Sequence, residues 1–399
     1  MNAAEKTDWI CRRARGVGFD LCGIAPVATE TTQANEESPL GGTFEELAHL
    51  PEWLARGYAG EMTYLSDARR GDPRLVLDGA RSLIVVALNY NSALPYSTEL
   101  PVTRGGDAPR AWISRYAWGD DYHEVLREKL EVVVAAMRGQ FTEPFEARAY
   151  VDTGPVIERV AAKYAGLGWL AKNTCLINEK MGSWLFLGVI VTTLDLAPSI
   201  PHGELPAADL CGNCRLCLDA CPTQAFPAPY VLDATRCISY LTIELRGAIP
   251  EELRPAMGRA VNGCDICQDV CPWNRKSPVT PLAAFQPRQF TPGAALSEGR
   301  HEESSFAPEL ERLASLTQAE FSTIFRGSAV KRAKWRGMVR NACVALGNSG
   351  VERNPAAHKR VVGLLERVAN CYDAQIAEHA RWALARLNGR ELNSAGSAD

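Results

Sequence analysis

The sequence predicts an α+β protein of three consecutive regions, and three features of the 399-residue chain lead to this prediction. Residues 1–200 alternate short β-forming runs with amphipathic helical patterns. Residues 201–290 contain eight of the 13 cysteines, in two motifs that each end in Cys-Pro. Residues 291–399 carry helical patterns alone. A chain of this length can bury several cores, so each region is expected to form a domain.

The first region opens with helical spacing over residues 5–17, followed by a strand in FDLCGIAPV. A polar loop is expected over residues 29–43, and helices at 44–56 and 61–76. The run SLIVVALNY predicts a buried strand. Residues 92–110 contain three prolines and two adjacent glycines. They predict a long irregular loop, a kind of segment that is often functional.

A helix over 122–137 and a strand over 147–152 come next. The glycine-rich turn AGLGWLAKN and a hairpin then lead into a strand from Trp184 to Thr193. Asp152 ends the first of these two strands. A carboxylate at a strand end that faces a loop is a candidate general acid. The alternative is that Asp152 caps the following helix, and spacing alone favours the cap.

The second region is organised around CGNCRLCLDACP, which ends at Pro222. Its spacing, C-x2-C-x2-C-x3-C-P, is that of bacterial ferredoxins, in which three cysteines bind one [4Fe–4S] cluster and the fourth binds another. A later motif, CDICQDVCP, and the isolated Cys237 complete the count. Cys237 is assigned by arithmetic, because the later motif lacks a third C-x2-C member. The predicted ligands of cluster 1 are Cys211, Cys214, Cys217 and Cys271, and those of cluster 2 are Cys221, Cys237, Cys264 and Cys267.

Structural zinc and disulfides are the alternatives for these cysteines. Zinc also uses paired C-x2-C units, but it does not explain the third closely spaced cysteine or the repeated Cys-Pro ending. Disulfides need an oxidising compartment, and the N-terminal MNAAEKTDWICRRARGVGF lacks an apolar export segment. No stretch approaches the ~20 apolar residues of a membrane span. We therefore expect a cytoplasmic iron–sulfur protein whose other five cysteines are core residues: Cys11, Cys22, Cys175, Cys343 and Cys371.

The third region contains a basic stretch, FRGSAVKRAKWRGMVRN, that has no acidic residue. Its six cations are Arg326, Lys331, Arg332, Lys334, Arg336 and Arg340. The formal net charge of the chain is −4, so a nucleic-acid surface has to be a local patch. The alternative is an ordinary solvated helix face, but the charge imbalance favours nucleic acid. Helices predicted at about 355–370 and 372–387 complete a small helical-repeat array.

Two clusters in series carry electrons one at a time, so a redox cofactor or substrate is expected against the first region. No G-x-G-x-x-G follows a strand, so no dinucleotide-binding fingerprint is visible. The segment DYHEVL is similar to the D-x-H-x-x-G histidine motif of some cobalamin proteins, but Leu126 replaces the glycine. His123 is therefore expected to be an ordinary helix residue.

Several motifs together resemble the epoxyqueuosine reductase family. They are VDTGPVIERVAAKYAGLGWLAKNTCLIN, GSWLFLG, CGNCRLCLDACPTQAF, CISYLTIELRG, GCDICQDVCPWN and GMVRNACVALGNSG, in the family's order. The resemblance implies that the epoxide of epoxyqueuosine at the tRNA wobble position is reduced to the alkene of queuosine. It also implies a cobalamin, two [4Fe–4S] clusters and a relation to the reductive dehalogenases. The implied domains are a nitroreductase-like cobalamin-binding domain (1–200), a ferredoxin-like domain (201–290) and HEAT-like tRNA-binding helical repeats (291–399).

The resemblance also assigns individual residues. Asp152 matches the proton donor in the family's VD motif, which reverses the preference for a helix cap. A donor has to carry a proton when the epoxide oxygen leaves, so desolvation against the corrin and a closed loop is expected to raise the pKa of Asp152. The implied cobalamin-binding residues are Asp152, Lys172, Asn173, Ser239, Tyr240, Cys264 and Asp265. The implied tRNA-binding residues are Thr242, Arg246, Lys331, Arg332, Lys334 and Arg340.

The implied electron donor is a reduced flavodoxin or ferredoxin, and we expect a monomer with no membrane partner. Two other functions compete. Reductive dehalogenation of a small organohalide predicts an export signal and no basic helical tail, and the sequence contradicts both. A non-catalytic iron–sulfur electron-transfer protein predicts that the purified protein carries no corrin.

Overall fold

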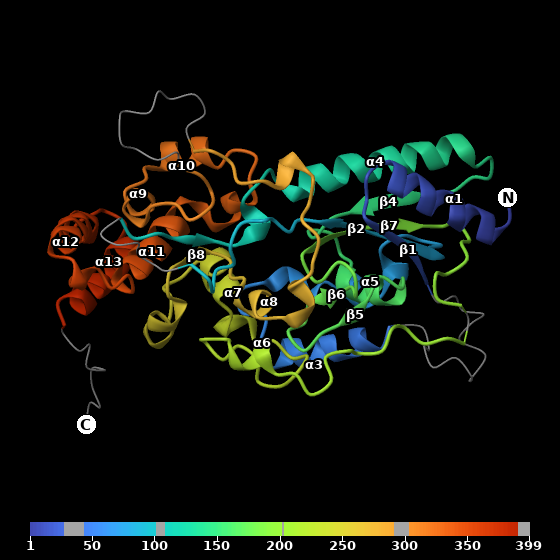
Figure 1. Ribbon diagram of the computed structural model, residues 1–399. Coiled ribbons are helices and arrows are strands. Elements are labelled where there is room, and N and C mark those ends of the chain that lie inside the picture. Colours follow the sequence, from blue (N-terminus) through green and yellow to red (C-terminus); the bar gives the residue numbers. More distant parts are fainter. Residues whose placement is uncertain (28–43, 101–107, 202, 291–302, 390–399) are drawn as a thin grey trace.

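The computed structural model describes residues 1–27, 44–100, 108–201, 203–290 and 303–389. The first region is built around an antiparallel sheet of four strands in the order β1-β2-β7-β4 (Figure 1). Every residue of β2 is buried, as a continuous run of β-forming residues predicts. The strands are β1 (Leu21–Pro26), β2 (Ser82–Asn89), β4 (Ala147–Tyr150) and β7 (Leu185–Thr192).

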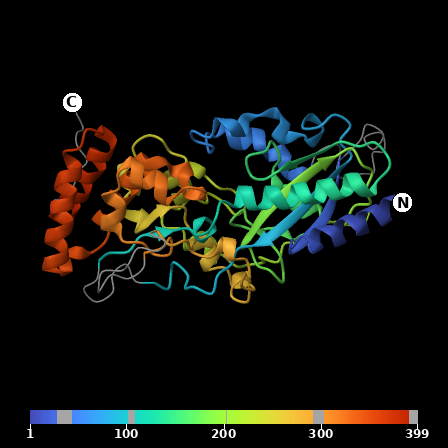
Figure 2. The same ribbon diagram turned by 90° about the horizontal axis from the view of Figure 1, so that it is seen from above.

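Helices cover both faces of this sheet, and successive side chains of a strand point to opposite faces. Ile84 and Val86 therefore pack into one core with α1 and α4. Leu83 and Val85 pack into a second core with α5. Figure 2 shows α4 lying across the strands. The helices are α1 (Ala3–Gly16), α4 (Tyr122–Gln140) and α5 (Glu158–Tyr164).

The helices predicted at 5–17 and 122–137 are confirmed as α1 and α4, but the helix predicted at 61–76 is wrong. Three separate 3₁₀ turns replace it. Asp67 and Asp72 explain the difference, because each carboxylate accepts the N–H two residues later and starts a new turn. The helix predicted at 44–56 begins as a 3₁₀ turn, and the loop predicted at 29–43 lies outside the described residues. The elements are η1 (Glu45–His49), α3 (Leu50–Ala55), η2 (Thr63–Ser66), η3 (Ala68–Gly71) and η4 (Pro73–Leu75).

The second region consists of short helical turns beside the cysteines. The turn α6 contains Cys217 and the turn α8 contains Cys267, and each ends two residues before a Cys-Pro pair. The helix α7 begins directly after Cys237 and ends before Arg246. A parallel strand pair, β3 with β8, joins this region to the first, and β5 pairs with β6 before β7. The bounds are β3 (Trp112–Ile113), β5 (Trp169–Leu170), β6 (Leu176–Ile177), α6 (Leu216–Asp219), α7 (Ile238–Ile243), β8 (Ala260–Asn262) and α8 (Ile266–Asp269).

The described part of the third region is helical. The helices predicted at about 355–370 and 372–387 are confirmed as α12 and α13. One apolar core joins these helices to Trp112 and Val261, so this region packs directly on the other two. The domain boundaries predicted near residues 200 and 290 stay predictions. The helices are α9 (Leu310–Ala314), α10 (Gln318–Ile324), α11 (Lys334–Gly347), α12 (Pro355–Ala369) and α13 (Ala374–Leu387).

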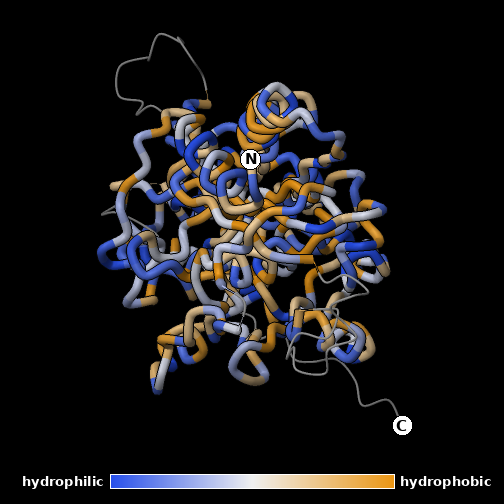
Figure 3. The backbone as a smooth tube through the Cα atoms, turned by 90° about the vertical axis from the view of Figure 1, so that its right-hand side faces the viewer, coloured by the Kyte–Doolittle hydropathy of each residue, from blue (hydrophilic) through white to orange (hydrophobic). Residues whose placement is uncertain are grey.

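The molecule is elongated, with the two termini at opposite ends (Figure 1). Hydrophobic and hydrophilic residues are mixed along the described chain, as expected when each element has a buried and a solvated side (Figure 3). Within the described ranges, no helix combines the length and the apolar character needed to cross a membrane.

The basic stretch of the third region does not form one helix. A 3₁₀ turn, η11 (Ala329–Ala333), ends where α11 begins, and Lys334 at the junction has a φ of +63°. This value lies in the left-handed region, where a non-glycine residue is strained. Lys331 and Lys334 therefore lie on different elements and do not share one helical face, although both side chains are exposed.

Arg340 was expected at the tRNA surface, but its side chain is buried, with 1% of the residue exposed. Its guanidinium donates to the carbonyls of Leu241 (2.6 Å), Leu245 (3.0 Å) and Gly247 (2.6 Å) at the end of α7. The last carbonyls of a helix lack partners within the helix and attract a cation. The tRNA prediction is wrong for Arg340, which joins α11 to α7 instead.

Replacement of Arg340 by Met should destabilise the protein. Met fills similar space but leaves three carbonyls without donors, and each unsatisfied buried group costs about 1–3 kcal/mol. We expect Tm to fall by roughly 5 °C or more. The matched control is Lys331→Met, in which the lost cation is exposed. Equal Tm values for the two variants in thermal unfolding would contradict the structural role of Arg340.

Candidate active site

Four of the predicted cluster ligands line one cavity: Cys211, Cys214, Cys217 and Cys271. Leu210, Leu216 and Trp273 form part of its wall. Burial raises the pKa of Cys217 and Cys271 to about 11, and repulsion between neighbouring thiolates adds to the shift. The fold thus brings together the four cysteines that the sequence assigns to cluster 1.

The other four thiols form a deeper group. Burial raises the pKa of Cys264 and Cys267 well above the usual value, and the neighbouring thiol of Cys237 raises it further. Cys221 also lies close enough to raise the pKa of Cys237 and Cys264. The structure therefore places the predicted cluster 2 ligands side by side. The assignment of cysteines to clusters itself stays a prediction.

Lys172 and Asn173 hold the two cysteine loops together. The Lys172 ammonium donates to the carbonyls of Gly212 and Cys214 in the outer loop. The Asn173 amide donates to the carbonyl of Cys267 in the deeper loop (3.3 Å). Both residues were predicted to contact cobalamin. The structure shows a different role for them, because their polar atoms form hydrogen bonds with the two cysteine loops.

The remaining predicted cobalamin contacts also support the deeper loop. Backbone N–H groups of Ser239 and Tyr240, and the Ser239 hydroxyl, form hydrogen bonds to Cys237 that oppose the effect of burial on its pKa. The Tyr240 hydroxyl accepts from the backbone N–H of Glu61 (2.9 Å). Asp265 is 1% exposed and its carboxylate accepts three hydrogen bonds from β3 and the residues that follow it. The prediction that Asp265 faces a cofactor is therefore wrong.

A glycine sets the approach of this deeper loop to the first region. Gly263 has a φ of +74°, and a Cβ on it would lie 2.5 Å from the Cβ of Ser114 and 3.2 Å from the Tyr116 ring. Only glycine fits such a close contact without displacement. The Gly263 N–H donates to the Thr242 hydroxyl (2.9 Å). Thr242 is 1% exposed, so the prediction that it binds tRNA is wrong.

Asp152 lies at the end of β4 in a strained turn. Its φ is +54°, and the N–H of Thr153 donates to the carbonyl of Val151 across it. Residues other than glycine seldom adopt this conformation, and such strain often marks a functional position. The helix α5 begins at Glu158, and its N-cap is Ile157, without a side-chain hydrogen bond. The alternative that Asp152 caps this helix is therefore wrong.

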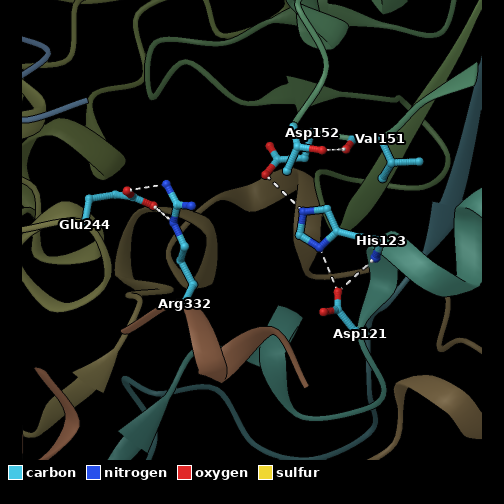
Figure 4. A network of polar contacts seen from close by, with 7 residues as sticks. Asp121, His123, Val151, Asp152, Glu244 and Arg332 are labelled. Carbon is cyan, nitrogen blue, oxygen red and sulfur yellow. Dashed lines mark hydrogen bonds and ion pairs between the residues drawn. The ribbon is translucent and has the colours of Figure 1, made fainter. Parts of the chain in front are cut away.

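His123 connects Asp152 to the start of α4 (Figure 4). Its Nε2 lies 3.3 Å from Oδ2 of Asp152, and its Nδ1 lies 2.7 Å from Oδ1 of Asp121. The same Asp121 oxygen accepts the backbone N–H of His123 and caps the helix. The prediction that His123 is an ordinary helix residue is wrong. The Asp-x-His spacing indicates that Asp121 can contact His123, but no nearby residue indicates that Asp152 also lies beside His123.

Asp121, His123 and Asp152 form a proton-holding trio, and their charges determine which of the three groups carries the proton. Burial disfavours the charged form of His123, but the hydrogen bonds and charges of Asp121 and Asp152 outweigh it and raise its pKa to about 9. Burial raises the pKa of Asp152, yet hydrogen bonds from His123 and Tyr122 and the His123 charge bring it below the usual value. In this state 64% of the Asp152 side chain is exposed. The raised pKa is expected for an Asp152 that the corrin and a closed loop desolvate, so it stays a prediction.

A second carboxyl group lies close to Asp152. Burial and the charge of Asp152 raise the pKa of Glu158 to about 7, and its Oε1 is buried without a donor from the described protein. Tyr116 and Tyr122 pack edge to face, with ring centroids 6.0 Å apart, and Tyr122 stacks on His123 at 4.0 Å. Tyr116 and Tyr122 therefore form a row of aromatic side chains between Gly263, in the deeper cysteine loop, and the proton-holding trio.

The opposite side carries a charged pair. Arg332 makes two 2.8 Å hydrogen bonds to the Glu244 carboxylate, and Figure 4 shows this pair facing His123 and Asp152. Tyr64 is 45% exposed, and its ring lies 5.8 Å from the Arg332 guanidinium. Of the predicted tRNA-binding cations, Arg246, Lys331, Arg332 and Lys334 are exposed.

The two cysteine groups and the trio of Asp121, His123 and Asp152 lie in one fold. A fold that combines cluster-binding cysteine motifs with a proton-holding site is that of an iron–sulfur oxidoreductase. The family model described as 4Fe-4S double cluster binding domain matches residues 210–274, and the model described as epoxyqueuosine reductase QueG matches residues 70–153.

Curated relatives give the particular family. The epoxyqueuosine reductase of Pseudomonas aeruginosa is 38% identical over 381 residues, which cover 95% of this chain and 92% of the relative. That of Gloeobacter violaceus is 43% identical over 349 residues, which cover 85% of this chain and 95% of the relative. The chain belongs to the epoxyqueuosine reductase family.

Solved structures agree. A crystal structure of epoxyqueuosine reductase with an epoxyqueuosine-modified tRNA-Tyr stem loop has a TM-score of 0.80 at 27% identity and covers 97% of this chain and 91% of its own. A Bacillus subtilis epoxyqueuosine reductase, whose catalytic aspartate loop is swung out of the active site, has a TM-score of 0.78 at 26% identity, with the same coverage. The predicted α+β architecture of nitroreductase-like, ferredoxin-like and helical-repeat parts is confirmed.

The Cys237→Ala variant tests the division of ligands. Loss of one thiolate from the deeper group should damage cluster 2 and leave cluster 1 largely intact. We expect about half of the wild-type iron and the loss of one cluster signal in electron paramagnetic resonance. Cys343→Ala is the matched control, since this buried cysteine lies in α11 and belongs to neither group. Full iron content in both variants would show that Cys237 is not a ligand.

Proposed function

We infer that this chain reduces epoxyqueuosine in tRNA to queuosine. Membership of the family and the likeness to a structure holding an epoxyqueuosine-modified stem loop support the substrate. The observation that carries the chemistry is the contact between Asp152 and His123, beside the deeper cysteine group (Figure 4). A pure electron carrier has no need for such a proton-holding pair, and this disfavours the non-catalytic alternative.

Two [4Fe–4S] clusters would form the electron path, with the outer one as the entry point. The outer cavity is bordered by Leu210 and Leu216, which are 48% and 46% exposed. Exposed apolar residues beside a redox centre suit a transient protein contact. A reduced flavodoxin or ferredoxin is the donor class that we propose, acting on a cytoplasmic monomer.

Cobalamin is the cofactor that we propose for the space around Asp152, and one observation supports it. Glu158 Oε1 is a buried acceptor without a donor from the described protein. A buried acceptor without a partner indicates a group that the protein alone does not supply. The amide groups at the edge of a corrin would donate to such atoms. When bound, cobalamin would supply a low-potential cobalt centre for the reduction of the epoxide.

The protein's own contribution is the proton. An epoxide oxygen leaves poorly as an alkoxide, and general acid catalysis is typically worth about 10²–10⁴-fold. Asp152 is the group that would deliver this proton. Its exposed carboxylate and strained turn place it where a bound nucleoside can reach it. Cover by the substrate would desolvate Asp152 and favour its protonated form.

The Asp152→Asn variant tests this function. Asn tolerates the same left-handed backbone and keeps the shape of the side chain, but it carries no acidic proton. Turnover of an epoxyqueuosine stem loop by pre-reduced, fully loaded enzyme should fall by about 10²-fold or more. Asp195→Asn is the matched control, because that side chain has a similar exposure of 61%. Near-normal turnover in loaded Asp152→Asn would remove Asp152 from the mechanism.

The exposed cations Lys331 and Lys334 are proposed to bind the tRNA backbone. Replacing both by Ala should lower the slope of log affinity against log salt concentration by about one per lost phosphate contact. Affinity should weaken similarly for different tRNA sequences, because phosphate contacts do not read bases. The matched control replaces the exposed Lys180 and Lys276, which lie on the cluster side. An unchanged salt slope in titrations of the Lys331 and Lys334 variant would leave these cations as ordinary surface charges.

A further inference from the structure

We propose that His123 loads Asp152 with both protons that each turnover consumes, so that Asp152 delivers protons it receives from the imidazole. This inference rests on the proposed function. It deepens that function by assigning the source of the protons to a residue that acts through Asp152.

The balance of the reaction creates the need for reloading. Conversion of an epoxide to an alkene breaks both C–O bonds and forms the C=C bond. The oxygen takes up two protons and leaves as water, while two electrons enter from the reduced donor through the clusters. One carboxyl group holds at most one proton. Asp152 therefore has to be reloaded within each turnover, and solvent water returns a proton to the His123 side chain, which is 30% exposed.

The geometry makes His123 the adjacent source. Nδ1 is held by the Asp121 carboxylate at 2.7 Å, so the ring presents Nε2 to Oδ2 of Asp152 at 3.3 Å. Stacking on Tyr122 and the helix cap made by Asp121 fix the ring further. An imidazole whose far nitrogen is bound to a carboxylate holds one tautomer and accepts and releases protons at the other nitrogen. Figure 4 shows this alignment.

The electrostatics place the waiting proton on His123. The pKa of His123 is raised to about 9 by its two carboxylate neighbours against the effect of burial, and the pKa of Asp152 is lowered. At neutral pH the two form an imidazolium–carboxylate pair. A substrate that covers them removes water, and desolvation penalises two separate charges. Transfer of the proton from Nε2 to Oδ2 cancels both charges and creates the acid that the epoxide oxygen requires.

Other charged and titratable groups also face this pair. Burial raises the pKa of Tyr122 and Tyr116, which stay protonated near neutral pH. Arg159 stabilises the Asp152 carboxylate from α5, while Arg332 is paired with Glu244 across the site. Glu158, whose pKa is raised to about 7 by burial and by Asp152, is the rival proton source. Glu158 and His123 are thus the two groups that an experiment has to separate.

The first measurement follows protonation directly, without turnover. In the full chain with oxidised clusters and labelled histidines, one histidine resonance should titrate near pH 9 and should vanish in His123→Gln. Asp121→Asn removes the charge beside Nδ1 but keeps the helix cap, since Asn caps about as well as Asp. It should lower this pKa by about one to three units. A His123 resonance that titrates near its ordinary value of about 6.5 would overturn the proposal.

The second measurement is single turnover with pre-reduced, cobalamin-loaded enzyme between pH 6.5 and 10. The wild-type rate should be flat and then fall above about pH 9, because the imidazole must be protonated to load Asp152. His123→Gln can still donate a hydrogen bond to Asp152 but cannot ionise. It should slow the reaction by about 10²-fold or more and lose the break near pH 9. Asp121→Asn should move the break downward.

The outcomes separate the two claims. Wild-type enzyme that binds cobalamin but forms no queuosine would overturn the proposed function, and the inference with it. Wild-type turnover together with an unchanged rate and pH profile in His123→Gln would overturn the inference alone. The same holds if Glu158→Gln, rather than Asp121→Asn, moves the break. A break that disappears in His123→Gln and shifts in Asp121→Asn supports loading through His123, since a purely structural role would not move it.

Discussion

The buried carboxylate of Asp265 is the contact on which the rest of the site depends. It belongs to the second cysteine motif, yet it accepts hydrogen bonds from the indole of Trp112 (3.0 Å) and the backbone N–H of Arg115 (2.8 Å). A buried carboxylate is tolerated only where such donors surround it. The next residue in the chain, Tyr116, packs against Tyr122 beside the proton-holding trio. One buried charge thus fixes the deeper thiols relative to the groups that hold protons.

Polar contacts also decide how the helical repeats are attached. Arg340 donates to the end of α7, and Asn341 donates to the carbonyls of Thr242 and Val261, both at 2.8 Å. These contacts are directional, so they fix the angle of α11 more sharply than apolar packing would. Because α7 starts directly after Cys237, the helices proposed to bind tRNA are joined directly to a predicted cluster ligand. Substrate binding and electron delivery therefore share one rigid support.

Local sequence patterns predicted the elements whose signal lies within a few residues. The cysteine spacing identified both thiol groups, and the apolar run 82–90 identified the central strand. The failures concern contacts between distant segments. Nothing near His123 indicates that Asp152 lies beside it, and the six cations of the basic stretch do not reveal that Arg340 turns inward. A charge count gives composition, whereas burial depends on which carbonyls the fold brings near each cation.

Separate routes for electrons and protons suit the chemistry of reduction at low potential. Electrons would arrive through the deeper thiols, where surrounding protein limits water. Protons are held on the side of Asp152, whose side chain is 64% exposed before a substrate covers it. While it stays exposed, the low pKa of Asp152 keeps it from acting as an acid. Only a substrate that excludes water reverses this preference, since the ion pair with His123 is then the costly state. Proton release therefore depends on the presence of the substrate oxygen. In its absence, the electrons held by the protein are not lost to the reduction of protons.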